Sequence, residues 1–189
     1  DEQALCHGHK LAIVHEYQNG DISQLSFIQL REAARAFAAG LQARGVQPGD
    51  RVFVFMGNTA EYGPLWMGLM LAGAVIVAGN IHLTAPEVAY QLEHCQPALA
   101  LVEPAHEALI REVRDAMDQG PEIVPVARGS LGPEGVSGAL AATSADYREP
   151  ELCSDDLAQI LYTSGTSARP KGVMLTHANL LWCGQAGAA

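Results

Sequence analysis

The run from Thr163 to Gly172, with the sequence TSGTSARPKG, combines residue types that suit anion binding. Small and hydroxyl-bearing residues lead to a cation, Lys171. Such a loop can turn backbone N–H groups toward an anion, add hydroxyl donors and bring an ammonium group to the same oxygens. Lys171 is one of only two lysines in a chain of net charge −10, so it supplies local positive charge that is scarce elsewhere. Phosphate is the ligand that this combination suggests.

The spacing within this run excludes three known site motifs. A Walker A loop needs Gly-Lys-Ser/Thr at its end, whereas Pro170 precedes Lys171 and Gly172 follows it. The nucleophile elbow G-x-S-x-G needs a glycine two residues before its serine, and that position is Tyr162 for Ser164. No G-x-G-x-x-G follows a strand-like segment, so a dinucleotide-binding fold has no support.

The segment YTSGTSARPKGV, residues 162–173, resembles the signature of the adenylate-forming (AMP-binding) superfamily, roughly [YF]-T-S-G-[ST]-T-G-x-P-K-G-V. The likeness includes the Met-Leu-Thr-His run that follows and the upstream segments 25–30, 38–45 and 48–52, and it covers about residues 20–185. Ser167 departs from the pattern but keeps a hydroxyl. Ala168 replaces glycine, which costs about 1–2 kcal/mol if that position needs a positive φ.

This resemblance implies an ATP-dependent acid–thiol ligase, most similar to acyl-CoA synthetases of the fatty-acid–CoA ligase type. Such enzymes convert a carboxylic acid and ATP to acyl-AMP and pyrophosphate, and then transfer the acyl group to CoA, with Mg²⁺ as the metal. Two alternatives stay open: an adenylation domain that loads a carrier protein, and a non-catalytic remnant of the same fold.

The resemblance also assigns roles to residues of the run. It implies that the ATP phosphates are bound by Thr163, Ser164, Gly165, Thr166, Ser167 and Lys171, and that the Thr163 hydroxyl lies near Mg²⁺. The family's catalytic residues, acyl pocket and adenine contacts lie further downstream in its sequences. The chain is therefore expected to be an N-terminal part of the large domain of such an enzyme, and to be inactive on its own.

Around this run the sequence predicts alternating helices and strands. Ser26 and Gln29 are spaced as a capping box that opens an amphipathic helix ending near Gly45, and Thr84 with Glu87 form a second box. Strands are predicted at 51–56, 74–78, 98–102, 122–127, 157–162 and 173–175, and further helices at 60–72, 85–94, 105–117 and from 176 onward. Strands separated by helices predict an α/β fold with helices layered on a mostly parallel sheet.

This pattern divides the chain into three segments. Residues 1–127 are expected to form a first α/β subdomain. Residues 128–156, rich in Gly, Ser, Pro and acidic side chains, are expected to form a surface connection with one short helix near 138–143. Residues 157–189 are expected to contain a strand, the phosphate-binding loop and the start of a helix.

Composition excludes several other classes of protein. The acidic balance disfavours a general nucleic-acid surface, because such surfaces depend on clustered Lys and Arg. Residues 62–86 lack Asp, Glu, Lys and Arg, yet their glycines and the β-type run 74–78 favour a buried helix and strand over a transmembrane segment.

Widely spaced cysteines indicate reduced thiols in a cytoplasmic protein, with peripheral membrane association left open. Cys6, His7 and His9 lack a fourth metal ligand at a fitting spacing. His94 and His106 are expected on helix surfaces. Nothing in the sequence indicates an oligomeric state.

Overall fold

A six-stranded sheet organises the chain. The computed structural model describes residues 2–132, 135–136, 138–163 and 169–187. The strand order is β10-β9-β4-β3-β5-β6, and only β10 runs antiparallel to its neighbour. The strands are β3 (Arg51–Phe55), β4 (Val75–Ala78), β5 (Leu99–Val102), β6 (Glu122–Pro125), β9 (Leu157–Thr163) and β10 (Lys171–Thr176). This confirms the predicted α/β fold with a mostly parallel sheet.

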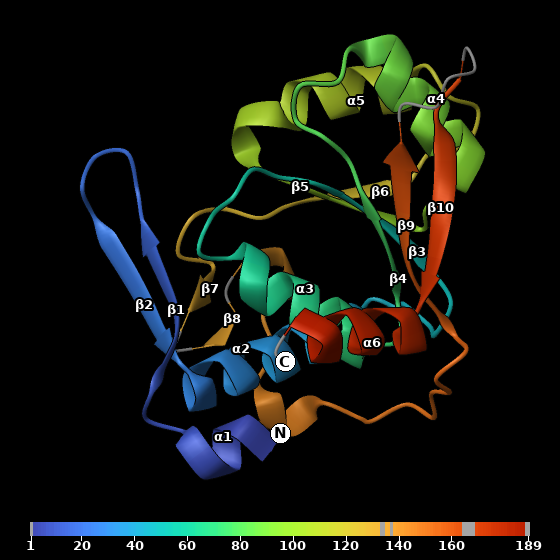
Figure 1. Cartoon of the computed structure of the whole chain (residues 1–189). Helices are drawn as coiled ribbons and strands as arrows, with labels where there is room; N and C mark the ends of the chain where they lie inside the picture. The colour runs from blue at the N-terminus through green and yellow to red at the C-terminus, as the bar shows by residue number, and fades with distance from the viewer. Residues whose placement is uncertain (1, 133–134, 137, 164–168, 188–189) are drawn as a thin grey trace.

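Helices cover both faces of the sheet because its strands are apolar on both sides (Figure 1). Val52 and Val54 pack against α2 (Phe27–Ala43) and α3 (Tyr62–Leu71), whereas Phe53 and Phe55 pack against α4 (Ala85–Cys95) and α5 (Glu107–Asp115). All four side chains are buried, and they alternate between the two faces as a strand requires. The predicted helix at 105–117 begins instead as a 3₁₀ turn, Pro104–His106.

The sheet is doubly wound around β3. The chain passes from β3 to β4 on one side, then crosses back to β5 on the other side and continues to β6. In open α/β sheets of this kind, ligands bind beyond the carboxyl ends of the parallel strands. β9 runs parallel to β4 and ends at Thr163, on this same side of the sheet where the carboxyl ends of the parallel strands lie.

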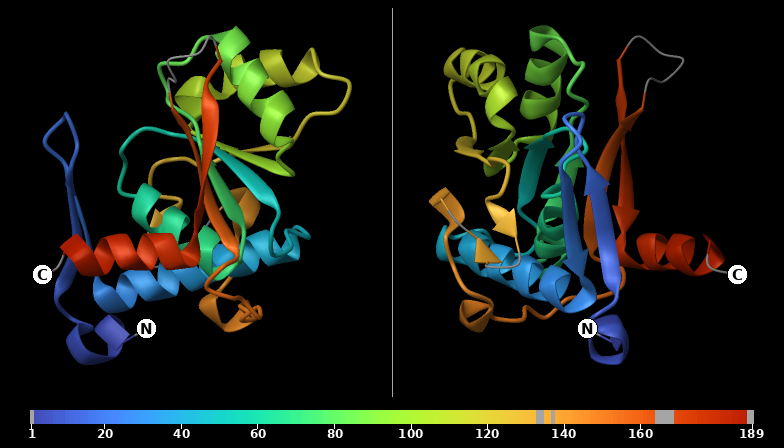
Figure 2. Two further views of the ribbon diagram at one scale, coloured as in Figure 1. Left: turned by 45° about the vertical axis from the view of Figure 1, so that its right-hand side comes forward. Right: turned by 90° about the vertical axis from the view of Figure 1, so that its left-hand side faces the viewer.

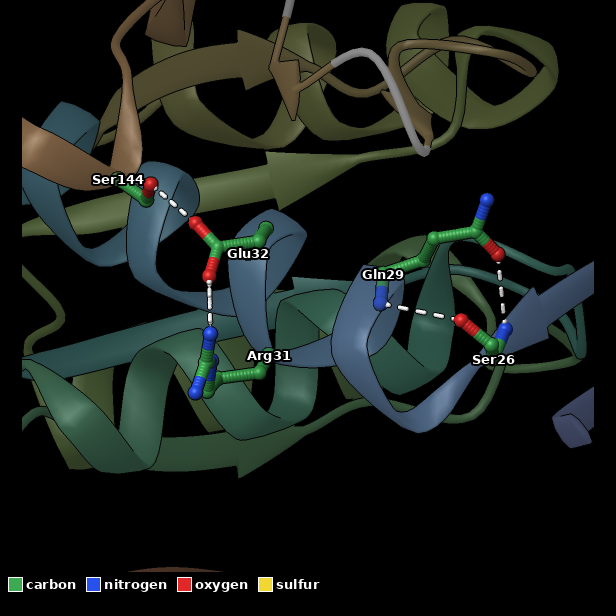
Figure 3. Close-up of polar contacts among 5 residues, drawn as sticks. All are labelled: Ser26, Gln29, Arg31, Glu32 and Ser144. Carbon is green, nitrogen blue, oxygen red and sulfur yellow. Dashed lines mark hydrogen bonds and ion pairs between the residues drawn. The ribbon is translucent and has the colours of Figure 1, made fainter. Parts of the chain in front are cut away.

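Both predicted capping boxes are confirmed. The backbone N–H of Gln29 donates to Ser26 Oγ at 3.4 Å, and the N–H of Ser26 donates to Gln29 Oε1 at 2.9 Å (Figure 3). Glu87 accepts from the backbone N–H and the hydroxyl of Thr84 at 2.8 and 2.7 Å. Gly45, just beyond α2, has a φ of +84°, as expected of a glycine that ends a helix.

Residues 128–156 are tied to the helical layer along much of their length. They contain the short strands β7 (Leu131–Gly132) and β8 (Gly135–Val136) and the 3₁₀ turns η2 (Gly138–Leu140) and η3 (Ser144–Asp146). The Ser144 hydroxyl donates to Glu32 of α2, which also pairs with Arg31 (Figure 3). The hydrogen bond from Ser144, and to a smaller extent the one from Arg31, lower the pKa of Glu32. Because β9 then joins β4, the segments before and after this connection share one sheet.

The N-terminal elements were not predicted. They are α1 (Glu2–His7) and a hairpin of β1 (Leu11–Glu16) and β2 (Ile22–Ser26), which stands beside the main sheet (Figure 1). Arg128 holds the hairpin turn, since its guanidinium lies 3.6 Å from the centre of the Tyr17 ring and 2.8 Å from Asp21.

Residues 62–86 contain α3, β4 and the start of α4. Within the described ranges, no helix combines the length and apolar character needed to cross a bilayer. The last helix, α6 (His177–Gly187), follows β10 and extends away from the other helices, with Leu181 and Trp182 exposed (Figure 2).

Gly68 permits the close packing of α3 on α2, and Gly68→Ala tests this contact. A Cβ at Gly68 would lie 2.7 Å from both the Ala34 carbonyl oxygen and Phe37 Cδ1. We expect the substitution to lower the free energy of unfolding by about 1–3 kcal/mol, measured by urea denaturation. Gly184→Ala on α6, where a Cβ meets no atom within 4 Å, is the control and should cost nothing. Equal stability of the two variants would contradict this account of the α2–α3 interface.

Candidate functional site

The ends of the predicted phosphate-binding loop are fixed by the β9–β10 hairpin. β9 pairs in parallel with β4, and the pairing ends at Ala78 and Leu161. β10 returns antiparallel to β9, and the register places Lys171 directly opposite Thr163. The two strands therefore lead to and from the loop at the carboxyl edge of the parallel strands (Figure 2).

The structure brings together Thr163 and Lys171 from the predicted set. Both residues are exposed. Side chains of directly opposed residues in an antiparallel pair lie on the same face, with Cβ atoms about 4.5–5.5 Å apart. A hydroxyl and an ammonium group therefore share one side of the hairpin. Ser164, Gly165, Thr166 and Ser167 lie outside the described residues, as does Ala168.

Tyr162 occupies the other face of the hairpin. Its half-buried ring packs with the core cluster under α4, and its cross-strand partner is Gly172. A Cβ at Gly172 would lie 3.0 Å from Ile160 Cγ2, so a side chain there would crowd this face. Because successive side chains alternate, Thr163 and Lys171 point away from α4.

Helix α4 contacts both arms of the hairpin close to the loop. His94 Nδ1 and the Tyr162 hydroxyl lie 2.7 Å apart, and the Tyr90 hydroxyl donates to the Pro170 carbonyl at 3.0 Å. Tyr90 and His94 stack with ring centroids 5.6 Å apart. The Arg169 guanidinium lies 5.9 Å from the centre of the Tyr90 ring.

Tyr90 was not predicted to belong to the site, and His94 was expected to be an ordinary helix-surface residue. His94 is exposed as expected, but it is bonded to the hairpin. The spacing of four residues between Tyr90 and His94 was an available signal, because it places both on one face of α4. His106 meets Phe55 edge-on, 5.5 Å between ring centroids.

Two groups at the contact between α4 and the hairpin are neutral, the Tyr162 hydroxyl and the Cys95 thiol. Burial raises the pKa of the Tyr162 hydroxyl, and the neighbouring Cys95 and Tyr90 add to this shift. Burial likewise raises the pKa of the Cys95 thiol to about 11. Both groups are therefore protonated near neutral pH. The positive charges on the hairpin are those of Arg169 and Lys171, next to the loop.

Among the residues that the structure describes, no three His, Cys, Asp or Glu side chains are grouped so as to hold a metal ion. Among the described residues at the end of β9, the Thr163 hydroxyl could supply an oxygen ligand to a metal ion. Mg²⁺ takes oxygen ligands and commonly binds through one or two protein groups together with substrate phosphates and water. A single hydroxyl beside the predicted phosphate-binding loop fits that mode of binding.

Residues 1–188 match the family model described as "AMP-binding enzyme". A crotonobetaine/carnitine–CoA ligase from Salmonella paratyphi B is 33% identical over an alignment of 190 residues that covers 97% of this chain and 37% of the ligase. The chain thus spans little more than a third of this curated relative.

Two solved structures share the fold. Apo MatB from Rhodopseudomonas palustris is 31% identical with a TM-score of 0.77, over 94% of this chain and 34% of that one. A fatty acyl-adenylate ligase from L. pneumophila, in complex with acyl adenylate and pyrophosphate, is 25% identical with a TM-score of 0.75. The match covers 96% of this chain and 30% of that one.

The buried Cys95 thiol predicts a loss of stability at high pH. Its pKa is raised from 9.0 to about 11, so the unfolded chain releases this proton first and unfolding is favoured as the pH rises through that range. The contribution of the neutral Cys95 thiol to the free energy of unfolding is complete below about pH 9 and is lost by about pH 11. Its size is on the order of 2 kcal/mol. Urea denaturation across this range should show a shallower fall in unfolding free energy for Cys95→Ala than for the wild type.

Cys153→Ala removes an exposed thiol and is the matched control, which should keep the wild-type dependence on pH. A Cys95→Ala variant with the same pH dependence as the wild type would contradict the prediction.

Proposed function

The chain belongs to the AMP-binding enzyme family, since residues 1–188 match its model, and from this we propose that its β9–β10 hairpin binds the phosphates of ATP during activation of a carboxylic acid. The observation that carries the proposal is the register that pairs Thr163 with Lys171 at the two ends of the loop. The pairing puts a hydroxyl donor and a cation on one exposed face, beyond the carboxyl edge of the sheet.

The proposed reaction begins with attack of a carboxylate oxygen on the α-phosphorus of ATP. The bond from that phosphorus to the bridging oxygen breaks, giving acyl-AMP, and pyrophosphate leaves with the electron pair. Negative charge develops on the leaving β- and γ-phosphates. The Lys171 ammonium and the Thr163 hydroxyl stabilise that charge, and groups fixed in advance are the effective ones because they need no reorganisation during the step.

Charge supports the assignment of Lys171. The chain carries −10 overall, so a polyphosphate approaching it meets general repulsion and needs a local cation. Lys171 is exposed at the loop, with Arg169 two residues away. When bound, Mg²⁺ neutralises phosphate oxygens, and Thr163 would contribute one oxygen ligand to it.

CoA is the proposed acceptor of the acyl group. The support is the name of the relative at 33% identity, a CoA ligase, which covers 97% of this chain. An acyl-adenylate ligase also shares the fold. Its name specifies no acceptor, and loading of a carrier protein, the alternative left open by the sequence, is the second candidate for the transfer step.

We further propose that residues 1–127, the connection 128–156 and residues 157–189 together supply the phosphate end of the nucleotide site. Turnover requires further parts of the family's enzymes, because this chain spans only about a third of its relatives. Those parts include the acyl pocket and the adenine contacts.

Lys171→Ala tests the assignment, in the full-length protein that contains this chain. We expect carboxylate-dependent ATP–pyrophosphate exchange, measured across short, long and aromatic acids, to fall about 100- to 1,000-fold, as on loss of one preorganised charge-stabilising group. Lys10→Ala replaces the chain's other lysine and should exchange at the wild-type rate.

The acid that supports exchange in the wild type would identify the substrate class. A folded wild-type protein that exchanges with no acid in the panel would contradict adenylation and favour a non-catalytic member of the family. Wild-type rates in Lys171→Ala would instead remove this lysine from the site while leaving adenylation in place.

A further inference from the structure

The last residues of β9 extend beyond the end of the strand β4 that supports it. Pairing with β4 ends at Leu161, so Tyr162 and Thr163 continue past the last β4 partner. On the other side, β10 is the edge strand of the sheet. The residues closest to the loop are therefore held by one strand pair alone, unless side chains from another element support them.

Helix α4 provides that support to both arms at once. His94 contacts the Tyr162 hydroxyl on the β9 arm at 2.7 Å, and the Tyr90 hydroxyl donates to the Pro170 carbonyl before β10 at 3.0 Å. The two side chains stack on each other, with an angle of 16° between their rings. Tyr162 lies edge-on to both, at 6.3 Å from Tyr90 and 5.8 Å from His94.

The hydrogen bond from Tyr90 to the Pro170 carbonyl fixes the backbone position of the next residue, Lys171. Proline has no backbone N–H, so its carbonyl is the single main-chain group of that residue that can form a hydrogen bond. This carbonyl belongs to the peptide plane that leads into Lys171. Fixing it therefore fixes the position from which the Lys171 side chain extends.

Neither Tyr90 nor His94 can act on phosphate directly through this arrangement. They contact the hairpin on the face of Tyr162, whereas Thr163 and Lys171 lie on the opposite face. Any effect on the reaction must pass through the strands. Small displacements are enough, because a misplacement of about 1 Å in a catalytic group can lower a rate about 100-fold.

We propose that Tyr90 and His94 are positioning residues that hold the two arms of the phosphate-binding hairpin, and thereby the Lys171 ammonium, in place for pyrophosphate release. This inference rests on the proposed function of the hairpin. It adds a residue pair from a different element, 80 residues away from Pro170 in the case of Tyr90.

Tyr90→Phe is the direct test, in the full-length protein. It keeps the ring and its stacking and removes only the hydroxyl. We expect kcat and kcat/KM for ATP–pyrophosphate exchange to fall together by about 3- to 10-fold, as expected when loss of one hydrogen bond weakens the stabilisation of the transition state by Lys171. In the same variant, hydrogen exchange should become faster at the one of the Lys171 and Gly172 amides that bonds to β9, since successive N–H groups of an edge strand point in opposite directions.

Tyr147→Phe is the matched control. Tyr147 is also half-buried, and its hydroxyl also donates to a backbone carbonyl, that of Leu71, at 3.1 Å. Loss of that bond should alter neither the exchange kinetics nor the amides of the hairpin. His94→Ala should lower the rate as Tyr90→Phe does, and His94→Asn, which places a polar atom near the position of Nδ1, should restore part of it.

A double variant separates positioning from general stability. If Tyr90 acts through Lys171, then Tyr90→Phe should have no further effect in Lys171→Ala, whereas independent effects would multiply. Full multiplication, or an unchanged rate in Tyr90→Phe, would overturn the inference while the wild type still exchanges pyrophosphate. A wild type without exchange would overturn the proposed function, and the inference with it.

Discussion

The parallel pairing of β9 with β4 is the constraint on which the candidate site depends. It brings residues 157–163 back to a sheet whose other parallel strands end by residue 125. The pairing places the end of β9 beside α4, which follows β4 in the chain. Without it, Thr163 and Lys171 would still be joined by the hairpin, but neither the edge of the sheet nor Tyr90 and His94 would be near them.

Hydrogen bonds to the helical layer hold the segment 128–156, which leads the chain back to β4. Ser144 bonds to Glu32 on α2, and the Gln42 side chain of α2 both donates to and accepts from the Arg148 backbone. These contacts reduce the freedom of a segment that would otherwise have a large conformational entropy. The helical layer thus does two things, covering one face of the sheet and guiding the chain toward the hairpin.

Local sequence predicted the elements whose causes are local. The capping boxes at Ser26 and Thr84 and the apolar strands were confirmed, because each depends on residues within a few positions. The β1–β2 hairpin was not predicted, since β1 has no buried residue to give a strong alternation. The contacts of Tyr90 and His94 could not be predicted either, because they depend on the order of strands in the sheet. The signature itself was read from sequence, whereas the pairing of its two ends required the structure.

The register of the hairpin also limits how the loop can vary in evolution. Thr163 and Lys171 face the same side only while they remain partners, and a shift of one residue would move Lys171 to the face of Tyr162. Replacements between them, such as Ser167 or Ala168, leave that partnership unchanged. An insertion or deletion that shifts the register moves the two side chains to opposite faces, so selection acts on the pairing of the strands as well as on the identity of the loop residues.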